Sequence, residues 1–298
     1  MTWKHYIKKF TEYLLIERGL SENTRINYQN DCEHLSFFYK DTNLNPVDIK
    51  VSDLQHFIYE YSKTHKTRSQ ARLLSGLNAF FEYLVLEDYR KDNPMLLIEA
   101  PKIGLHLPDT LSEEEINLLI DGIDLSHPQG ERNRTILETL YGCGLRVSEL
   151  IELKISDLYF NEGFIKVTGK GNKQRLVPIG LYTQNFIENY LQNHRELTPP
   201  KKGNEDIIFL NRRGNALTRV MIYTIIKQLA EKINLKKNIS PHTFRHSFAS
   251  HLLQGGADLT VIKTLLGHES ITTTEVYLHM DSSRLAEVVN QYHPRAQK

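Results

Sequence analysis

The segment Ser240-Pro241-His242-Thr243-Phe244-Arg245-His246 indicates how the C-terminal part of this 298-residue chain folds. Serine followed by proline is typical of a helix N-cap and first helical position, so a helix should begin here. His242 and Arg245 are three residues apart and therefore lie on one face of that helix. The helix should continue through Phe248 and stop at Gly255-Gly256.

Two further elements follow this helix and carry a second histidine and a tyrosine. A short helix from Asp258 should stop at Gly267, which leaves His268 just beyond the break. Residues 272–274 can cap another short helix that would carry Tyr277 about one turn from its start. Far upstream, the chain contains Gly144-Leu145-Arg146-Val147-Ser148-Glu149.

These residue types suit attack on a phosphodiester. Guanidinium and imidazole groups match the oxygens on which negative charge accumulates, and a phenol can form a covalent ester that conserves the bond energy. Such a reaction is reversible and needs no nucleotide. The sequence therefore predicts Tyr277 as nucleophile, Glu149 as a group that orients Arg146 or its neighbours, and a phosphate clamp made of Arg146, His242, Arg245 and His268.

Several stretches together resemble the tyrosine recombinase (phage integrase) family, and within it the Xer branch. They are residues 144–150, 168–173, 242–253 and 266–268 with Tyr277, and in the N-terminal part residues 21–24 and 80–84. The similarity covers nearly the whole chain. It implies a catalytic set in which no member is missing: Arg146, Lys170, His242, Arg245, His268 and Tyr277.

Lys170 lies in a predicted hairpin. Residues 164–167 and 175–178 are β-rich, and Gly169-Lys170-Gly171-Asn172-Lys173 between them has turn chemistry. The resemblance implies that Lys170 is the general acid for the leaving 5′ oxygen. A P-loop is excluded because five residues, not four, separate Gly163 from Gly169, and because Gly171 follows the lysine.

Each of these residues also has an ordinary structural explanation. Arg146 and Glu149 could form a surface ion pair, and His242 and His246 could bind a metal, although the glutamate of H-E-x-x-H is missing. Tyr277 is one of 15 tyrosines. Independent coincidence does not account for all six in order, so we expect the recombinase chemistry with no metal and no cofactor.

Composition alone does not indicate a nucleic-acid-binding protein. The chain has 37 Lys+Arg against 36 Asp+Glu, a net charge of +1. DNA binding would therefore require basic residues that are concentrated on the contacting surface, because they are not in excess overall. Several crowd the start of an N-terminal helix, and others lie in the hairpin. We predict DNA contacts from Arg25, Lys66, Arg68, Arg72, Lys173 and Arg175.

The apolar spacing predicts a mainly α chain of two domains. Four helices should fill residues 1–92, the third capped by a box at 52–55 and the fourth starting near Ser69. Residues 93–110 would be a linker, and 111–298 the catalytic domain, which opens with a capping box at 112–115. The resemblance implies a SAM-like DNA-binding domain followed by an α+β catalytic domain with a small β-hairpin sheet.

The chain should end in an amphipathic helix over residues 283–292. The resemblance implies that this helix docks in a neighbouring protomer, with docking on its own catalytic domain as the alternative. The two cysteines, Cys32 and Cys143, favour a reducing cytoplasm, and we expect no signal peptide and no membrane span.

The resemblance implies a site-specific recombinase that cuts and rejoins duplex DNA through a 3′-phosphotyrosyl intermediate, serving resolution of chromosome dimers. It also implies a homo- or hetero-tetramer with a paralogous recombinase, and it leaves activation by a septal DNA translocase open. The alternatives are an integrase or resolvase of a mobile element or plasmid, a type IB topoisomerase, and a catalytically silent site-specific DNA-binding protein.

Overall fold

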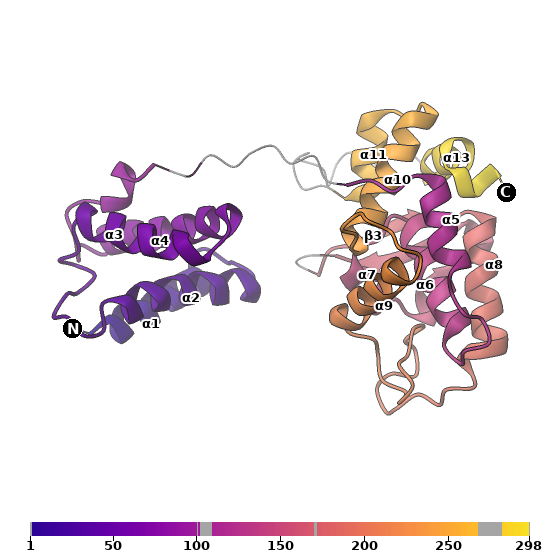
Figure 1. The fold of residues 1–298 in the computed structure, drawn as a ribbon, viewed down its shortest axis with the longest axis horizontal. Helices are drawn as coiled ribbons and strands as arrows, with labels where there is room; N and C mark the ends of the chain where they lie inside the picture. The colour runs from indigo at the N-terminus through magenta and orange to yellow at the C-terminus, as the bar shows by residue number, and fades with distance from the viewer. Residues whose placement is uncertain (1, 100, 102–108, 170–171, 268–281, 298) are drawn as a thin grey trace. The chain divides into compact units, whose positions relative to one another are not determined.

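The computed structural model describes residues 2–99, 101, 109–169, 172–267 and 282–297 (Figure 1). The chain divides into two compact units, Met1–His106 and Leu107–Lys298. Each unit has its own hydrophobic core. Within the described ranges, no helix is long and apolar enough to cross a membrane.

The N-terminal unit is helical, as predicted. Apolar residues recur every three or four positions along its helices and meet in a core that includes Phe10, Leu35, Leu54 and Phe80, all fully buried. Its elements are α1 (Trp3–Ile16), α2 (Glu22–Phe38), α3 (Val51–Thr64), α4 (Thr67–Leu86) and the short 3-10 helix η1 (Pro94–Leu97).

The predicted N-cap of the third helix was wrong. Helix α3 begins at Val51 with Lys50 as its N-cap, because the Asp53 carboxylate accepts the backbone N–H of Lys50 at 2.8 Å. The acidic group at the third helical position therefore makes the cap, not Ser52. Helix α4 begins at Thr67, two residues before the predicted start near Ser69, and ends at Leu86 as predicted.

An ion pair between a half-exposed arginine and a buried aspartate joins α2 to α4. Arg72 Nη1 on α4 donates to Asp31 Oδ2 on α2 at 2.7 Å; the Arg72 side chain is 41% exposed, whereas the Asp31 side chain is fully buried. Burial raises the pKa of Asp31 to about 6, and the charge and hydrogen bond of Arg72 oppose this only in part. The second oxygen of Asp31, Oδ1, has no hydrogen-bond partner among the described residues.

The C-terminal unit packs helices around α6 and a small antiparallel sheet. Tyr141 and its neighbours on α6 are fully buried at the centre of the core. The helices are α5 (Glu113–Asp121), α6 (Gly130–Gly142), α7 (Val147–Ile151), α8 (Leu181–Tyr190), α9 (Arg219–Lys232), α10 (Pro241–Gly255), α11 (Leu259–Leu266) and α13 (Ser282–Tyr292). Short helical turns lie at Ile155–Asp157, Phe160–Glu162, Leu191–Arg195 and Pro294–Gln297.

The sheet contains the predicted hairpin and one strand more. Strands β2 (Phe164–Thr168) and β3 (Gln174–Pro178) pair antiparallel, with Val167 opposite Arg175. A third strand, β1 (Leu158–Tyr159), pairs with β2 on its other side. Only two residues long, β1 carries no periodic pattern that could predict it.

The helix boundaries predicted around α10 and α11 are confirmed. Ser240 is the N-cap of α10 and Pro241 its first residue, and Gly256 ends it in the left-handed conformation. Asp258 caps α11 by accepting the backbone N–H groups of Thr260 and Val261. The capping box of Ser112 and Glu115 at the start of α5 is also present.

The C-terminal helix α13 packs on its own unit. Its apolar side, with Leu285 and Val289 buried, contacts α10, α11 and β3. Beyond it, Arg295 Nε donates to Glu138 Oε2 on α6 at 2.8 Å, and Arg295 Nη1 donates to Asn117 Oδ1 on α5 at 2.8 Å. The predicted amphipathic helix is thus present, and in the single chain it packs on its own catalytic unit.

The titration of Asp31 gives a prediction about stability. The folded unit holds this proton more tightly than the unfolded chain, whose carboxyl titrates near pH ~4, so stability should fall as the pH rises from about 4 to about 6. The variant Asp31→Asn removes this cost and should gain up to about 3 kcal/mol relative to the wild type between pH ~4 and ~7. Urea unfolding of the full chain followed by fluorescence of Trp3, its single tryptophan, measures this unit.

The matched control for this measurement is Asp41→Asn, because Asp41 is exposed. It should not show the gain in stability that is expected of Asp31→Asn. A difference between Asp31→Asn and the wild type that stays constant with pH would contradict the burial argument.

The buried pair of Arg295 and Glu138 gives a second prediction. Arg295→Met leaves the Glu138 carboxylate buried without this cation and should cost about 3 kcal/mol, so amide hydrogen exchange in α13 should accelerate. The double variant Glu138→Gln/Arg295→Met should recover most of the loss because the buried carboxylate charge is removed together with its cation. Arg213→Met, at an exposed arginine, is the control. Slow exchange in all three variants would mean that the pair does not hold the helix.

Candidate functional site

A tight turn between α6 and α7 places Arg146. Gly144 in this turn has a left-handed φ of +58°, and the ring of Phe248 on α10 occupies the space that a side chain at this position would need. Glycine is therefore required here on both counts. The turn brings Arg146 to the N-cap position of α7 and directs the carbonyl of Gly144 toward α10.

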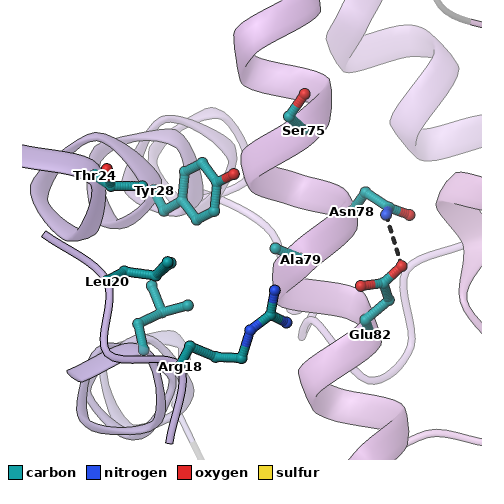
Figure 2. Close-up of a pocket in the computed structure, with 9 residues that line it drawn as sticks. Arg18, Leu20, Thr24, Tyr28, Ser75, Asn78, Ala79 and Glu82 are labelled. Carbon is teal, nitrogen blue, oxygen red and sulfur yellow. Dashed lines mark hydrogen bonds between the residues drawn. The ribbon is translucent and has the colours of Figure 1, made fainter. Parts of the chain in front are cut away.

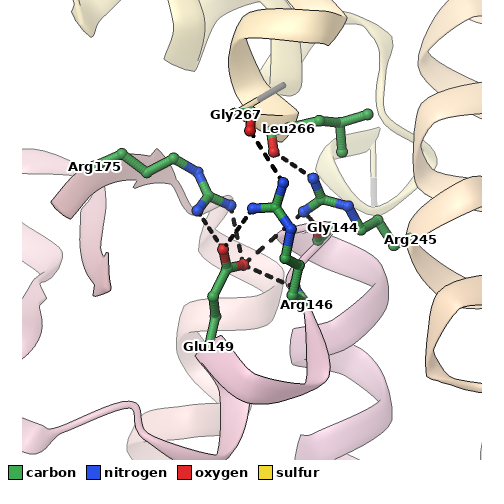
Figure 3. A network of polar contacts seen from close by, with 7 residues as sticks. All are labelled: Gly144, Arg146, Glu149, Arg175, Arg245, Leu266 and Gly267. Atoms are coloured by element: carbon green, nitrogen blue, oxygen red, sulfur yellow. Dashed lines mark hydrogen bonds and ion pairs between the residues drawn. The ribbon is translucent and has the colours of Figure 1, made fainter. Parts of the chain in front are cut away.

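Glu149 lies at the centre of a network of arginines (Figure 3). Its Oε2 accepts the backbone N–H of Arg146 at 2.8 Å, and its Oε1 accepts Arg146 Nη1 at 2.9 Å. Arg175 on β3 donates from Nη2 to Oε2 at 3.0 Å and from Nη1 to Oε1. Arg245 Nη1 on α10 is 3.9 Å from Oε2.

Two of these arginines hold the end of α11. Arg245 Nη1 donates to Gly144 O at 2.8 Å and its Nη2 donates to Leu266 O, while Arg146 Nη2 donates to Gly267 O at 3.0 Å (Figure 3). The last carbonyls of a helix lack intrahelical partners and carry partial negative charge, so cations are favourable there. The residue that follows Gly267 in the chain is His268.

The cluster carries excess positive charge. Burial alone would raise the pKa of the Glu149 carboxyl, but the hydrogen bonds and charge of Arg175, together with the hydrogen bonds from Arg146, hold it below its ordinary value. Glu149 is therefore ionised at neutral pH. Three guanidinium groups against one carboxylate leave a local charge of 3 − 1 = +2. Such a site suits an anion.

The structure brings some predicted catalytic residues together and does not describe others. Arg146, Arg245 and Glu149 meet in one cluster. His242 lies exposed in the first turn of α10, three residues before the buried Arg245. The remaining members of the predicted set, Lys170, His268 and Tyr277, lie outside the described residues.

The predicted DNA-contacting residues of the N-terminal unit differ in their surroundings. Lys66 and Arg68 are exposed at the start of α4. Arg72 is half-exposed and pairs with Asp31, while Arg25 on α2 is partly buried.

In the hairpin, the two predicted DNA contacts also differ. Lys173 is exposed. The Arg175 side chain is only 9% exposed and binds Glu149 with both terminal nitrogens.

The sequence analysis did not predict that Arg175 joins the arginine cluster around Glu149. Alternate residues of a strand point to the same face, so Arg175 shares a face with the buried Val177, while Leu176 is 48% exposed. This two-residue alternation along the strand is the feature of the sequence that could have placed Arg175 on the inward face. Because Leu176 and Val177 are both apolar, the sequence did not reveal which of the two faces inward.

The N-terminal unit contains a separate pocket of about 300 Å³ between α1, α2 and α4 (Figure 2). Its polar groups come from Arg18, Tyr28, Asn78 and Glu82 among others, and the Asn78 amide donates to Glu82 at 2.8 Å. Its remaining lining residues are Leu14, Leu20, Thr24, Ser75 and Ala79.

Comparison with known proteins covers both units. The phage integrase family matches residues 109–284, and the phage integrase N-terminal SAM-like domain matches residues 7–88. The tyrosine recombinase XerD of Oceanobacillus iheyensis is 40% identical over 98% of this chain and 99% of its own length. The XerD of Pseudomonas putida is 38% identical over 97% of each.

Solved structures share the fold. The XerH site-specific recombinase bound to its difH substrate before cleavage superposes with a TM-score of 0.67 at 22% identity, covering 94% of each chain. A lambda integrase dimer bound to a COC' core site gives 0.74 at 19% identity, covering 93% of this chain and 77% of that one. The predicted two-domain fold is confirmed, and the chain belongs to the phage integrase family of tyrosine recombinases.

Proposed function

We propose that this chain cuts and rejoins duplex DNA at specific sites through a covalent 3′-phosphotyrosyl intermediate on Tyr277, and that it resolves chromosome dimers. The observation that carries the proposal is the +2 cluster in which Arg146 and Arg245 meet around Glu149. The identity of 40% with a XerD recombinase over nearly the whole chain favours the Xer role over that of a mobile-element integrase.

The charge of the cluster suits the transition state of this reaction. A phosphodiester carries one negative charge, and in-line attack by a phenolate gives a pentacovalent phosphorus with two. Donors fixed in advance by the protein stabilise such developing charge without having to reorganise. Arg146 and Arg245 are held in this way by Glu149 and by backbone carbonyls, and the exposed His242 beside them would supply a further donor.

The bond changes balance without a nucleotide. Tyr277 Oη would attack phosphorus and pass its proton to His242, the bond from phosphorus to the 5′ oxygen would break, and Lys170 would protonate that oxygen. Rejoining is the reverse reaction, with a 5′ hydroxyl of another strand as the attacking group. His268, which follows the carbonyl held by Arg146, would complete the phosphate clamp.

Assembly on DNA forms part of the proposal. XerH has been solved on its difH site, and lambda integrase as a tetramer on a Holliday junction. We infer that this chain likewise binds a duplex recombination site, with residues 1–92 and 111–298 as its two DNA-contacting domains and 93–110 as the linker. Lys66, Arg68 and Lys173, exposed in the structure, would contact phosphates.

The active assembly would be a tetramer, alone or with a paralogous recombinase, and whether a septal DNA translocase activates it stays open. In that assembly α13 would leave its own unit and dock in a neighbouring protomer. The protein would act in the cytoplasm.

The first test concerns the nucleophile. Tyr277→Phe keeps the ring but removes the attacking oxygen, so it should bind the target site with unchanged affinity and form no covalent adduct on a nicked suicide substrate. Denaturing gels after single-turnover incubation measure the adduct. The control is Tyr292→Phe at the end of α13, which should form the adduct like the wild type. If Tyr277→Phe still traps the substrate while Tyr292→Phe does not, the nucleophile is Tyr292.

The second test concerns the general acid. Lys170→Ala should slow cleavage of ordinary DNA by at least ~100-fold, the usual scale for loss of a positioned proton donor. A 5′-bridging phosphorothiolate leaves without protonation and should restore the rate of the variant. Equal defects on the two substrates would instead assign Lys170 to binding.

A further inference from the structure

Arg175 makes the most complete contact with the central carboxylate of the cluster. Its two terminal nitrogens donate to the two oxygens of Glu149, the paired geometry that makes arginine–carboxylate contacts strong and directional. Both side chains are buried, with 9% of Arg175 and none of Glu149 exposed. The remaining nitrogen of Arg175, Nε, is buried without a hydrogen-bond partner within the described ranges. Among those residues, Glu149 is therefore the group that fixes this guanidinium.

The carboxylate of Glu149 is saturated only because Arg175 is present. An ionised carboxylate offers about four lone-pair sites. Two are filled by the backbone N–H and Nη1 of Arg146, and two by Arg175. Arg245 Nη1 lies 3.9 Å from Glu149 Oε2, which is too far for a hydrogen bond.

Removal of Arg175 would change what the other two arginines bind. Two acceptor sites on Glu149 would open, and the local charge would fall from +2 to +1. At this depth the attraction between opposite charges is much stronger than in water. Arg146 and Arg245 would then be drawn toward the carboxylate, which competes with a phosphate for the same guanidinium groups.

We propose that Arg175 is a positioning residue of the recombination reaction, which occupies Glu149 so that Arg146 and Arg245 stay available to the phosphate. The proposal rests on the proposed function, since it names how the same cluster is kept ready for DNA. It replaces the sequence-based prediction of a DNA contact for Arg175, whose donors face Glu149. Lys173, two residues earlier in the same hairpin, is exposed and is the better candidate for that contact.

Contact with Gly267 supports this assignment. Gly267 ends α11 with a left-handed φ of +62°, and a side-chain carbon added there would lie 3.1 Å from Arg175 Cδ and 3.2 Å from its Nε. The backbone of Gly267 therefore packs directly on Arg175, and its carbonyl accepts from Arg146. Arg175 thus touches Glu149 and also the end of the helix that precedes His268.

The experiment compares Arg175→Ala, Glu149→Gln, the double variant and Lys173→Ala in the full-length protein. Half-site affinity is measured at several salt concentrations, and the single-turnover rate of adduct formation is measured on a nicked suicide substrate at saturating protein. Arg175→Ala should bind DNA like the wild type yet cleave about 100-fold more slowly, the scale of a misplaced catalytic group. Lys173→Ala, in contrast, should weaken binding and reduce its salt dependence.

The double variant separates charge competition from loss of fold. Glu149→Gln removes the carboxylate that captures the arginines and returns the cluster charge to +2. The double variant should therefore cleave roughly tenfold faster than Arg175→Ala, a coupling of the size measured for interacting pairs. Arg175→Lys, which keeps the charge but not the paired geometry, should cleave at an intermediate rate.

Three results would overturn the proposal. They are a wild-type cleavage rate in Arg175→Ala, a loss of affinity with no loss of rate at saturation, and a double variant as slow as or slower than Arg175→Ala. The last result would mean that Arg175 maintains the fold or touches the phosphate itself. If the wild-type protein forms no adduct on its target site, the proposed function fails first, and that outcome is distinct from the other three.

Discussion

The polar contacts that join α7, β3, α10 and the end of α11 in the C-terminal unit depend on the ionised carboxylate of Glu149. It joins four segments that are distant in the chain: the turn before α7, strand β3, helix α10 and, through the arginines, the end of α11. Three buried or half-buried guanidinium groups this close would repel one another without it. A buried charge is tolerated only when it is paired and hydrogen-bonded. Here the arginines supply positive charge and N–H donors, and Glu149 supplies negative charge and acceptors.

This arrangement also explains how the cluster that we propose as the phosphate site can be positively charged and still rigid. Arginines that bound only the phosphate would be mobile in the absence of DNA. Here the backbone carbonyls of Gly144, Leu266 and Gly267 accept some of their N–H groups, and these carbonyls need donors in any case because two of them end a helix. The fold and the site therefore satisfy the same hydrogen-bonding requirements, so the donors are in place before substrate arrives.

Features set by neighbouring residues could be predicted from the sequence, whereas pairings set by the fold could not. The N-cap at Ser240, the stops at Gly256 and Gly267 and the hairpin of β2 and β3 all depend on a few adjacent residues, and the structure has them. The pair of Arg175 with Glu149 spans 26 positions and depends on the face that β3 turns inward. The pairs of Arg72 with Asp31 and of Arg295 with Glu138 span 41 and 157 positions.

These three pairs change how the basic residues of this chain should be interpreted. Arg72, Arg175 and Arg295 each donate to a buried carboxylate and fasten one element to another: α4 to α2, β3 to α7, and the C-terminal tail to α6. Arginine suits this use because its guanidinium stays charged and offers several donors, two of which bind the same carboxylate in the case of Arg175. A count of lysines and arginines therefore overestimates the DNA-contacting charge, and a net charge of +1 hides a local excess of +2 at the site. Placement of charge by the fold, more than its total, fits this protein to an anionic substrate.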